Sequence, residues 1–383
     1  MSETRQAVSC VTPERIWALE TFASFVGVDL HKCTVTLVAV DPQRQIIDHL
    51  TTSTKCVDKI HEFLTRLPRP CWMAVEAVGF VEWFIDAYGP TVDLMSIAHA
   101  TELERLRGKH RKNDFNSAKD VAERLARNEC PLGWIADSET AQLRKLGRHW
   151  HQLSRTLSRT KQHMKSMLNA AHLPGPQLNG AAAQKWLLAH GHRLKDVTRR
   201  AFENFLDLIL LIERQRQVLR RQIIFANRSD KFKNLTDLLK TVPGIDEIWA
   251  CIIAAEIGDF ARFPNADAIE FWAGLTPDTT ESAGRTQSGK ITKAGSRTLR
   301  WAVCKAAVTL CRSDAAQERV RQHLIRQTGK CKPKANVAMG RRLLRILFAM
   351  VRDHKPYVCA EPRAHQARAN AARLRKRRQR TPA

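Results

Sequence analysis

Asp29 is the first side chain of this sequence whose type and position could do chemistry. It interrupts the apolar stretch FVGVDLHKCTVTLVAV at residues 25–40, where alternation of apolar and polar residues predicts strands. A carboxylate on a strand costs desolvation energy unless water, a cationic side chain or a metal ion compensates it. Gly27 beside it indicates close backbone approach by a ligand. Taken alone, the stretch favours a simpler role, in which Asp29 ends a strand and caps the turn before His31 and Lys32.

Two further acids stand at the ends of predicted elements. Glu76 lies at the end of the apolar run 71–77, which predicts a buried strand, and Asp114 stands at the entrance of a helix predicted over residues 117–127. An Asp or Asn at a helix entrance commonly caps the helix, and this is the role expected of Asp114 when it is considered alone. None of the three acids establishes a site by itself.

A third group of candidate residues is cationic. Between Arg144 and Lys165 apolar residues recur at three- and four-residue steps, and the other positions carry positive charges without a single acid. A solvated coiled-coil face normally mixes signs. We expect one edge of this helix to lie along nucleic-acid phosphates, although the acidic helix of a partner would also fit. The cations expected to bind are Arg144, Lys145, Arg148, Arg155, Arg159, Lys161 and Lys165.

The elements that would position the acids follow an α/β order. Residues 1–22 are assigned to an N-terminal arm and residues 23–135 to one domain. Its predicted elements are strands 25–30, 34–40 and 45–52, helix 57–67, strand 71–77, helix 81–88, strand 92–97 and helix 117–127.

The rest of the chain is predicted to be helical. Residues 136–231 form a basic coiled-coil region, with one apolar seam from Leu143 to Ala171 and a second that includes Val197 and Leu208. Two such helices can pair with each other or with another copy of the chain, so self-association is expected.

Residues 232–359 are assigned to a helical C-terminal domain, followed by a basic disordered tail at residues 360–383. VPGI at residues 242–245 predicts a helix-hairpin-helix-like turn, whose amides would meet DNA phosphates. Asp246 would repel phosphate there, so a helix-capping role remains as the alternative. The Gly-, Ser- and Thr-rich stretch 273–300 is interpreted as a phosphate-binding loop. Its cations include Arg285, Lys290 and Lys293.

The charge balance favours polyanionic partners. The chain has 63 Lys and Arg against 38 Asp and Glu, a net charge of +25, and nucleic acid is favoured over an anionic membrane. No apolar run is long enough to span a bilayer, and acids interrupt the N-terminus, so a cytoplasmic protein is expected. The ten cysteines show no zinc-ligand spacing and are expected to be reduced.

Four groups of motifs occur in a fixed order: VGVDLHK at 26–32, AVEAVGF at 74–80, KNDFNSA at 112–118, and a set from VPGI to ITKAGSRTLR at 242–300. Together they resemble the bacterial insertion-sequence transposases of the one-ten and eleven-eleven groups, which include pilin-gene invertases. The resemblance covers nearly all of residues 25–357. It implies an RNase H-like (RuvC-like) domain with an Asp, Glu, Asp, Asp metal site, a coiled-coil linker, and a C-terminal domain with a nucleophilic serine.

Carried over residue by residue, the resemblance places three metal-binding acids at Asp29, Glu76 and Asp114, which would hold Mg²⁺ (or Mn²⁺). The fourth acid of the pattern falls on Ser117, whose hydroxyl is a poor substitute. Asp120 lies about 9 Å further along a helix and about 120° round from Asp114. Three outcomes stay open: a three-acid site works, Asp120 reaches the metal through an irregular helix start, or this copy is inactive.

The family's serine corresponds to Ser282 in ESAGR, with Ser288 in QSG as the alternative. The implied reaction is attack by Ser282 on a DNA phosphate, giving a phosphoserine-linked strand, while Arg285 and Lys290 clamp the phosphate. The family also uses a structured non-coding RNA that pairs with donor and target DNA, so a guide RNA held by the basic surfaces is implied as a partner.

The sequence is therefore interpreted as a site-specific DNA recombinase of an insertion element, acting as a homo-oligomer (dimer or tetramer) on the element ends and a target. Two other classes stay open. One is a decayed copy that binds nucleic acid without catalysis, and the other is a RuvC-like nuclease that hydrolyses DNA with water and forms no serine adduct.

Overall fold

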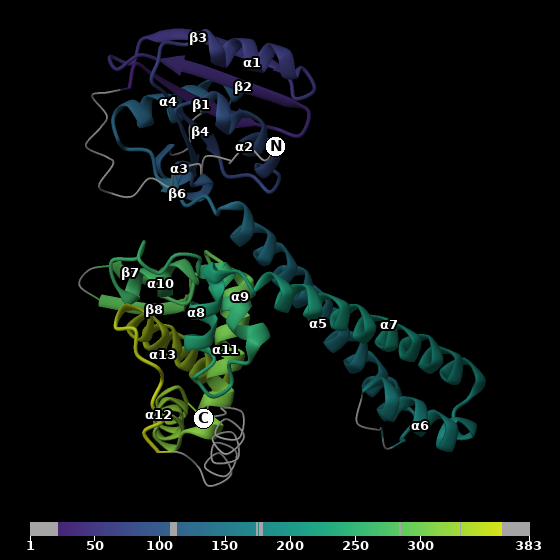
Figure 1. The fold of residues 1–383 in the computed structure, drawn as a ribbon. Helices are drawn as coiled ribbons and strands as arrows, with labels where there is room; N and C mark the ends of the chain where they lie inside the picture. The colour runs from purple at the N-terminus through teal and green to yellow at the C-terminus, as the bar shows by residue number, and fades with distance from the viewer. Residues whose placement is uncertain are drawn as a thin grey trace, which may run out of the picture. The chain divides into compact units, whose positions relative to one another are not determined.

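The computed structural model describes residues 22–107, 113–173, 175, 179–282, 285–329 and 331–361. Contacts divide the chain between Asp137 and Ser138 into two units, which are described separately (Figure 1). The second unit contains both the predicted coiled-coil region and the predicted C-terminal domain. Nearly all of the N-terminal arm and of the basic tail lies outside the described residues.

The N-terminal unit is built on a six-stranded mixed sheet with the order β3-β2-β1-β4-β5-β6. The central strand β1 runs antiparallel to β2 and parallel to β4. The strands are β1 (Ser24–Leu30), β2 (Thr34–Val40), β3 (Ile46–Ser53), β4 (Cys71–Glu76), β5 (Leu94–Ala98) and β6 (Leu132–Gly133). The predicted α/β class is confirmed, and each of the five predicted strands forms within about two residues of its expected position.

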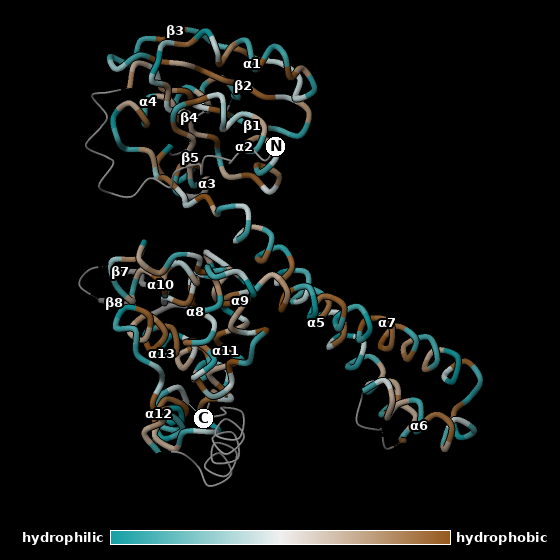
Figure 2. Tube along the Cα trace, in the orientation of Figure 1, coloured by the Kyte–Doolittle hydropathy of each residue, from teal (hydrophilic) through white to brown (hydrophobic). Residues whose placement is uncertain are grey.

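Helices cover both faces of this sheet. Helices α1 (Val57–Thr65) and α2 (Glu82–Tyr88) share a core with one face, and α3 (Ala100–Arg107) and α4 (Asp114–Ala126) with the other (Figure 1). Strands β1, β2, β4 and β5 carry mostly hydrophobic residues, as Figure 2 shows for β2. Because side chains alternate along a strand, Asp29 shares the α4 face with Phe25 and Gly27.

Gly27 allows α4 to lie directly on β1. A Cβ atom at this position would lie 2.0 Å from the Ala118 carbonyl oxygen and 2.5 Å from the Ala122 nitrogen. The expectation that a ligand approaches Gly27 is therefore wrong, because the backbone of α4 occupies that space. This close approach brings the start of α4 to the end of β1.

The C-terminal unit is mainly helical. Its elements are α5 (Ser138–Ala170), α6 (Gly180–His190), a 3-10 turn (Gly191–Arg193), α7 (Asp196–Ala226), α8 (Asp230–Leu239), α9 (Glu247–Ile257), α10 (Ala266–Trp272), β7 (Pro277–Ser282), β8 (Arg285–Ile291), α11 (Arg297–Ser313), α12 (Ala315–Gln327) and α13 (Lys332–Arg352). Helices α5 and α7 pack side by side (Figure 1), so the two long helices pair within one chain. Among the described helices, none combines the length and the apolar character needed to cross a membrane.

The predicted seam of α7 is correct in part. Its members Leu194, Ile212 and Leu219 are buried, but Val197 and Leu208 are 84% and 44% exposed. Between Leu194 and Ile212 the buried positions are Phe202, Leu206 and Ile209. The apolar run at residues 208–212 occupies several faces of the helix, so spacing alone could not choose the buried one. Hydrophobic and hydrophilic residues alternate along both α5 and α7 (Figure 2).

The stretch interpreted as a phosphate-binding loop contains a β-hairpin. Strands β7 and β8 pair in antiparallel fashion, with Thr280 opposite Gln287 and Ser282 opposite Arg285. Its β-branched threonines favour strand conformation, whereas the neighbouring glycines and serines are typical of a loop, which is why a loop was predicted.

Candidate metal site and nucleic-acid contacts

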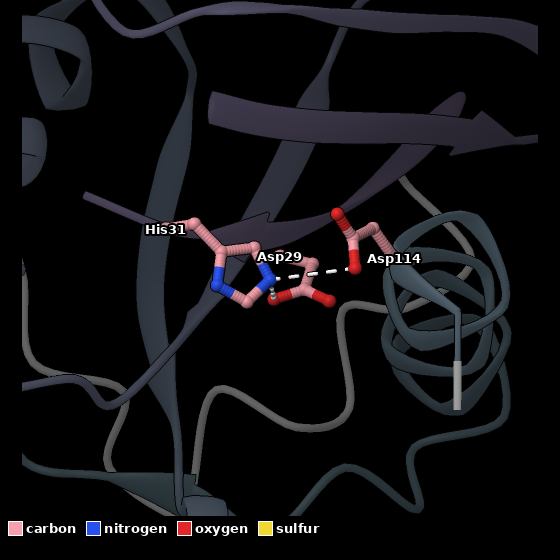
Figure 3. A group of neighbouring side chains, drawn as sticks. All are labelled: Asp29, His31 and Asp114. Atoms are coloured by element: carbon pink, nitrogen blue, oxygen red, sulfur yellow. Dashed lines mark ion pairs between the residues drawn. The ribbon is translucent and has the colours of Figure 1, made fainter. Parts of the chain in front are cut away.

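Three side chains converge at the end of β1. Asp29 lies on β1, His31 follows it, and Asp114 is the first residue of α4. One potential ligand atom from each lies within 4.8 Å of the others. His31 Nε2 is 3.5 Å from Asp29 Oδ1 and 3.4 Å from Asp114 Oδ1 (Figure 3). Two carboxylates from different elements therefore face one imidazole.

The environment makes a negative charge on Asp29 costly. The Asp29 side chain is only 14% exposed, whereas those of His31 and Asp114 are 53% exposed. Burial raises the pKa of the Asp29 carboxyl, His31 opposes that shift, and the nearby charges of Glu76 and Asp114 raise the pKa further. A cation at this position would offset the repulsion between the acids.

The capping roles expected of the two aspartates are filled by other groups. Asn113 caps α4, because its side-chain oxygen accepts a hydrogen bond from the Asn116 N–H at 2.7 Å. In the turn between β1 and β2, the His31 N–H donates to the Thr34 carbonyl at 2.9 Å. Asp29 and Asp114 are thus available for another function.

Arg107 on α3 binds the other two acids of interest. It donates to Glu76 Oε2 at 3.0 Å and to Asp120 Oδ2 at 2.9 Å, and its third contact is the Ser117 carbonyl at 3.1 Å. Arg124 donates to the second Asp120 oxygen at 2.8 Å. The structure brings Glu76 close enough to influence Asp29. It holds Asp120 between two guanidinium groups and apart from Asp29, His31 and Asp114, which together are called the Asp29 cluster.

Sequence reasoning did not single out His31 or Arg107 as site residues. His31 lies two residues after Asp29 in the motif VGVDLHK, and this position was the signal that could have identified it as a site residue. Arg107 precedes the basic segment GKHRK, so its type alone did not distinguish it from its neighbours. Only the proximity of α3 to β4 and α4 identifies it.

The residues proposed for the serine chemistry are described only in part. Ser282 is the last residue of β7, and Arg285 opposite it begins β8. The side chains of residues 278–282 and 285–290 lie outside the described part, and with them those of Ser282, Ser288, Arg285 and Lys290. Lys293 is exposed between β8 and α11, with a positive φ of 55°.

Five of the seven cations predicted on α5 to bind nucleic acid fall into two groups. Arg148 pairs with Glu256, which is 2% exposed, through contacts of 2.7 and 3.0 Å, and Arg144 donates to the Ala255 carbonyl at 3.0 Å. These two arginines thus join α5 to α9. In the second group, Lys161 pairs with Glu213 of α7 at 3.1 Å and lines a pocket with Arg155 and Arg159. Lys145 and Lys165 are exposed.

The predicted hairpin segment consists of α8, a turn and α9. Gly244 in the turn has a φ of +97°, which glycine adopts readily. Asp246 Oδ1 accepts a hydrogen bond from the Trp249 N–H at 2.9 Å, which confirms its role as a helix cap. A Cβ on Gly244 would lie 2.6 Å from the Thr309 Cβ, so this turn packs closely on α11.

Comparison with known proteins gives matches in both units. Residues 26–173 match a family model described as a transposase of the DEDD type of IS110, and residues 236–322 match the model of the transposase IS116/IS110/IS902 family. The first match contains the Asp29 cluster. The second contains the segment from α8 through the β-hairpin into α12.

Individual relatives are similar over part of their length. A protein of insertion element IS110 from Streptomyces coelicolor is 30% identical over 39% of this chain and 36% of its own length. A pilin gene-inverting protein from Moraxella bovis is 30% identical over 34% of this chain and 41% of its own length. A protein of insertion element IS900 from Mycobacterium paratuberculosis is 32% identical over 32% of this chain and 30% of its own length. The aligned regions therefore span less than half of these relatives. Because the two family models match in chain order, the chain belongs to the IS116/IS110/IS902 family of transposases.

Proposed function

We propose that this chain is a site-specific DNA recombinase of an insertion element. It cuts and exchanges DNA strands through a covalent bond to Ser282, with a divalent metal ion bound by acids of the N-terminal unit. The observation that supports this most directly is the convergence of Asp29 and Asp114 within 4.8 Å in a chain of this family. The mixed sheet, with its acid at the end of the central strand, supports an RNase H-like (RuvC-like) fold.

The donor set fits a divalent cation. Carboxylate oxygens are the ligands that Mg²⁺ and Mn²⁺ prefer, and the imidazole of His31 suits Mn²⁺ better than Mg²⁺. Asp29 and Asp114 would hold the ion, with Glu76 as the third acid of the proposed set. The bound ion would polarise a phosphodiester and stabilise the charge that develops on its oxygens.

The serine step conserves the energy of the phosphodiester. The Ser282 oxygen forms a bond to phosphorus as its hydroxyl loses a proton, and the bond from phosphorus to the leaving strand breaks. The leaving oxygen takes up a proton and becomes a free hydroxyl, which can attack the phosphoserine of another strand in the reverse sense. Arg285 and Lys290, close to Ser282 in the hairpin sequence, supply positive charge for the phosphate.

Partners and assembly follow from charge and fold. We assign DNA, comprising element ends and target, and a structured guide RNA as the polyanions that the +25 charge accommodates. The α5 and α7 pair serves as a coiled-coil region. Exposed apolar residues on α7, such as Leu211 and Phe225, support the formation of a homo-oligomer. The hairpin of α8 and α9 contacts DNA.

One observation favours a second function, nucleic-acid binding without catalysis. Ser117 provides no carboxylate at the fourth position of the pattern, and Arg107 and Arg124 hold Asp120. A chain with a weakened metal site would still bind RNA or element ends. A RuvC-like nuclease that uses water remains the third candidate.

A denaturing gel, which reports adduct and cleavage, together with a native gel of the same samples, which reports binding, separates these three functions. The chain is produced together with its flanking non-coding DNA and incubated with Mg²⁺ and labelled DNA spanning the element ends. A labelled protein adduct that disappears in Ser282→Ala and in Asp29→Asn supports the recombinase. Cleavage that persists in Ser282→Ala supports the nuclease, and binding with neither adduct nor cleavage supports the non-catalytic binder.

A further inference from the structure

The C-terminal unit contains a pocket of about 620 Å³ in which three tryptophans meet. Trp150 belongs to α5, Trp249 to α9 and Trp301 to α11. The ring centroids of Trp249 and Trp301 are 4.6 Å apart, and Trp150 lies 5.8 and 5.9 Å from them. The three rings are tilted or edge-on to one another and not stacked in parallel, and all three line the pocket.

Trp301 on α11 is held in place by His151 of α5. The imidazole of His151 stacks on it, with centroids 4.1 Å apart and an interplanar angle of 13°. His151 Nδ1 lies 3.0 Å from Thr298 Oγ1, which fixes the orientation of the imidazole. The ring that lines the pocket is thus supported from within the protein.

The same pocket is strongly cationic. The described residues that line it include no acid, and its cations come from α5, α7 and α11. They are Arg155, Arg159, Lys161, Arg216 and Lys305. Lys161 is neutralised in part by Glu213, at 3.1 Å. The other four leave a clear excess of positive charge beside the tryptophans.

Arg216 shows that this charge is not fully satisfied within the protein. Its guanidinium lies 4.4 Å from the centre of the Trp150 ring. Its Nε atom is buried and has no hydrogen-bond partner among the residues that the structure describes. A buried donor without a partner is costly, and an anionic oxygen entering the pocket would supply the missing acceptor.

We propose that this pocket binds one unpaired nucleotide of a nucleic acid, with the base against the tryptophans and its phosphate among the arginines. Every base has a π face that stacks on aromatic side chains, and flanking cations bind the backbone. An acidic peptide would satisfy the charge but would leave the aromatic surface without a planar partner. The proposal rests on the assignment of nucleic acid as the partner, but it requires neither the metal site nor Ser282.

The test compares oligonucleotides that carry the same charge. Fluorescence anisotropy with the full-length chain in EDTA gives the affinity for labelled oligothymidylate and for an abasic strand of equal length. Base stacking is expected to make the first bind about 5- to 150-fold more tightly. Trp301→Leu should abolish this preference and leave the affinity for the abasic strand unchanged, which also shows that the variant is folded. An oligouridylate series tells whether RNA or DNA is the better ligand.

The matched control is Trp83→Leu, which removes a partly exposed tryptophan from the N-terminal unit and should preserve the full base preference. Lys305→Gln should lower the affinity for both strands by the same factor. Equal binding of the two strands by the unchanged protein would overturn the proposal. An unchanged base preference in Trp301→Leu would also overturn it. So would competition by polyglutamate as strong as that by oligothymidylate. Because the assay contains no metal ion, loss of DNA cleavage does not affect its outcome.

Discussion

Arg107 binds Glu76 directly, with 3.0 Å between Nη1 and Oε2, and thereby links α3 to the end of β4. The same guanidinium reaches Asp120 on α4. Both acids retain the pairing they need at a half-buried position, where an isolated charge would be costly. Arg107 is thus a positioning residue beside the Asp29 cluster, and its positive charge competes with any cation that Glu76 would help to hold.

Arg107→Gln should lower stability and strengthen metal binding. Glu76 and Asp120 lose a charged partner, which we expect to lower the unfolding free energy by about 1–3 kcal/mol. The electrostatic potential around Asp29 becomes more negative, because a positive charge is removed. Thermal unfolding and calorimetric titration with Mn²⁺ measure the two effects. Arg105→Gln is the matched control, since Arg105 is 77% exposed and pairs with Glu102 one turn away. Unchanged Mn²⁺ affinity in Arg107→Gln would contradict the competition.

Gly27→Ala should displace α4. The added Cβ would lie 2.0 Å from a backbone oxygen that cannot move without the helix, so a loss of about 1–3 kcal/mol is expected. Asp114 would move with α4 away from Asp29, and Mn²⁺ affinity should fall together with the unfolding temperature. Gly79→Ala, where a Cβ meets none of the described atoms within 4 Å, should change neither. A stable Gly27→Ala chain would show that α4 does not depend on this close approach.

The contrast between Gly27 and Asp29 shows how far the sequence could predict the site. Asp29, Glu76 and Asp114 were predicted as one set only through the family resemblance, since each acid alone had a simpler explanation. The strands were predictable because β-branched alternation is a local signal. The approach of α4 to Gly27 is not local, and for that reason the glycine was assigned to a ligand.

Other features depended on contacts between distant segments. Arg148 was predicted to bind phosphate, and its pairing with Glu256 could not be predicted, because the two residues lie 108 positions apart. The three tryptophans of the pocket are likewise far apart in sequence. Trp150 belonged to the predicted apolar seam, but nothing local linked it to Trp249 and Trp301. The β-hairpin at residues 277–291 has local β-branched residues, but the glycines among them favoured a loop.

Stability should fall in mild acid because of His151. Burial, together with the charges of Arg155 and Arg297, lowers the pKa of His151 to about 4, below its ordinary value of 6.5. The unfolded chain therefore binds more protons between these values, and stability is lost as pH falls from 6.5 towards 4, by up to about 3 kcal/mol. Urea unfolding at several pH values should show a shallower decline for His151→Gln. Parallel curves would mean that His151 is not responsible.

Ser117→Asp should restore a carboxylate one turn from Asp114. Residues three apart lie on the same face of a helix, so the new acid would face the same side as Asp114. We expect Mn²⁺ affinity to rise about tenfold, and the serine adduct to increase if the missing acid limits catalysis. Asn116→Asp is the control, because it adds the same charge at an exposed position of the same helix turn. An equal gain in both variants would indicate a general charge effect.

The two groups of α5 arginines should respond differently to substitution. Arg148→Gln removes the closest partner of buried Glu256, so the unfolding free energy should fall by about 2 kcal/mol, with Ser296 and Arg144 retaining part of the pairing. Arg159 lies at the exposed edge of the tryptophan pocket. Arg159→Gln should therefore change the unfolding free energy by less than about 0.5 kcal/mol.

Nucleic-acid affinity should show the opposite order. If Arg159 contacts a phosphate, its loss reduces the slope of log affinity against log salt by about 1, because one fewer counterion is released on binding. Arg148→Gln should leave that slope unchanged in protein that remains folded, since Glu256 already occupies its guanidinium. Anisotropy titrations at several salt concentrations, paired with urea unfolding of the same samples, compare the two variants. A reduced slope in Arg148→Gln with full stability would reverse the assignment and make Arg148 a phosphate ligand.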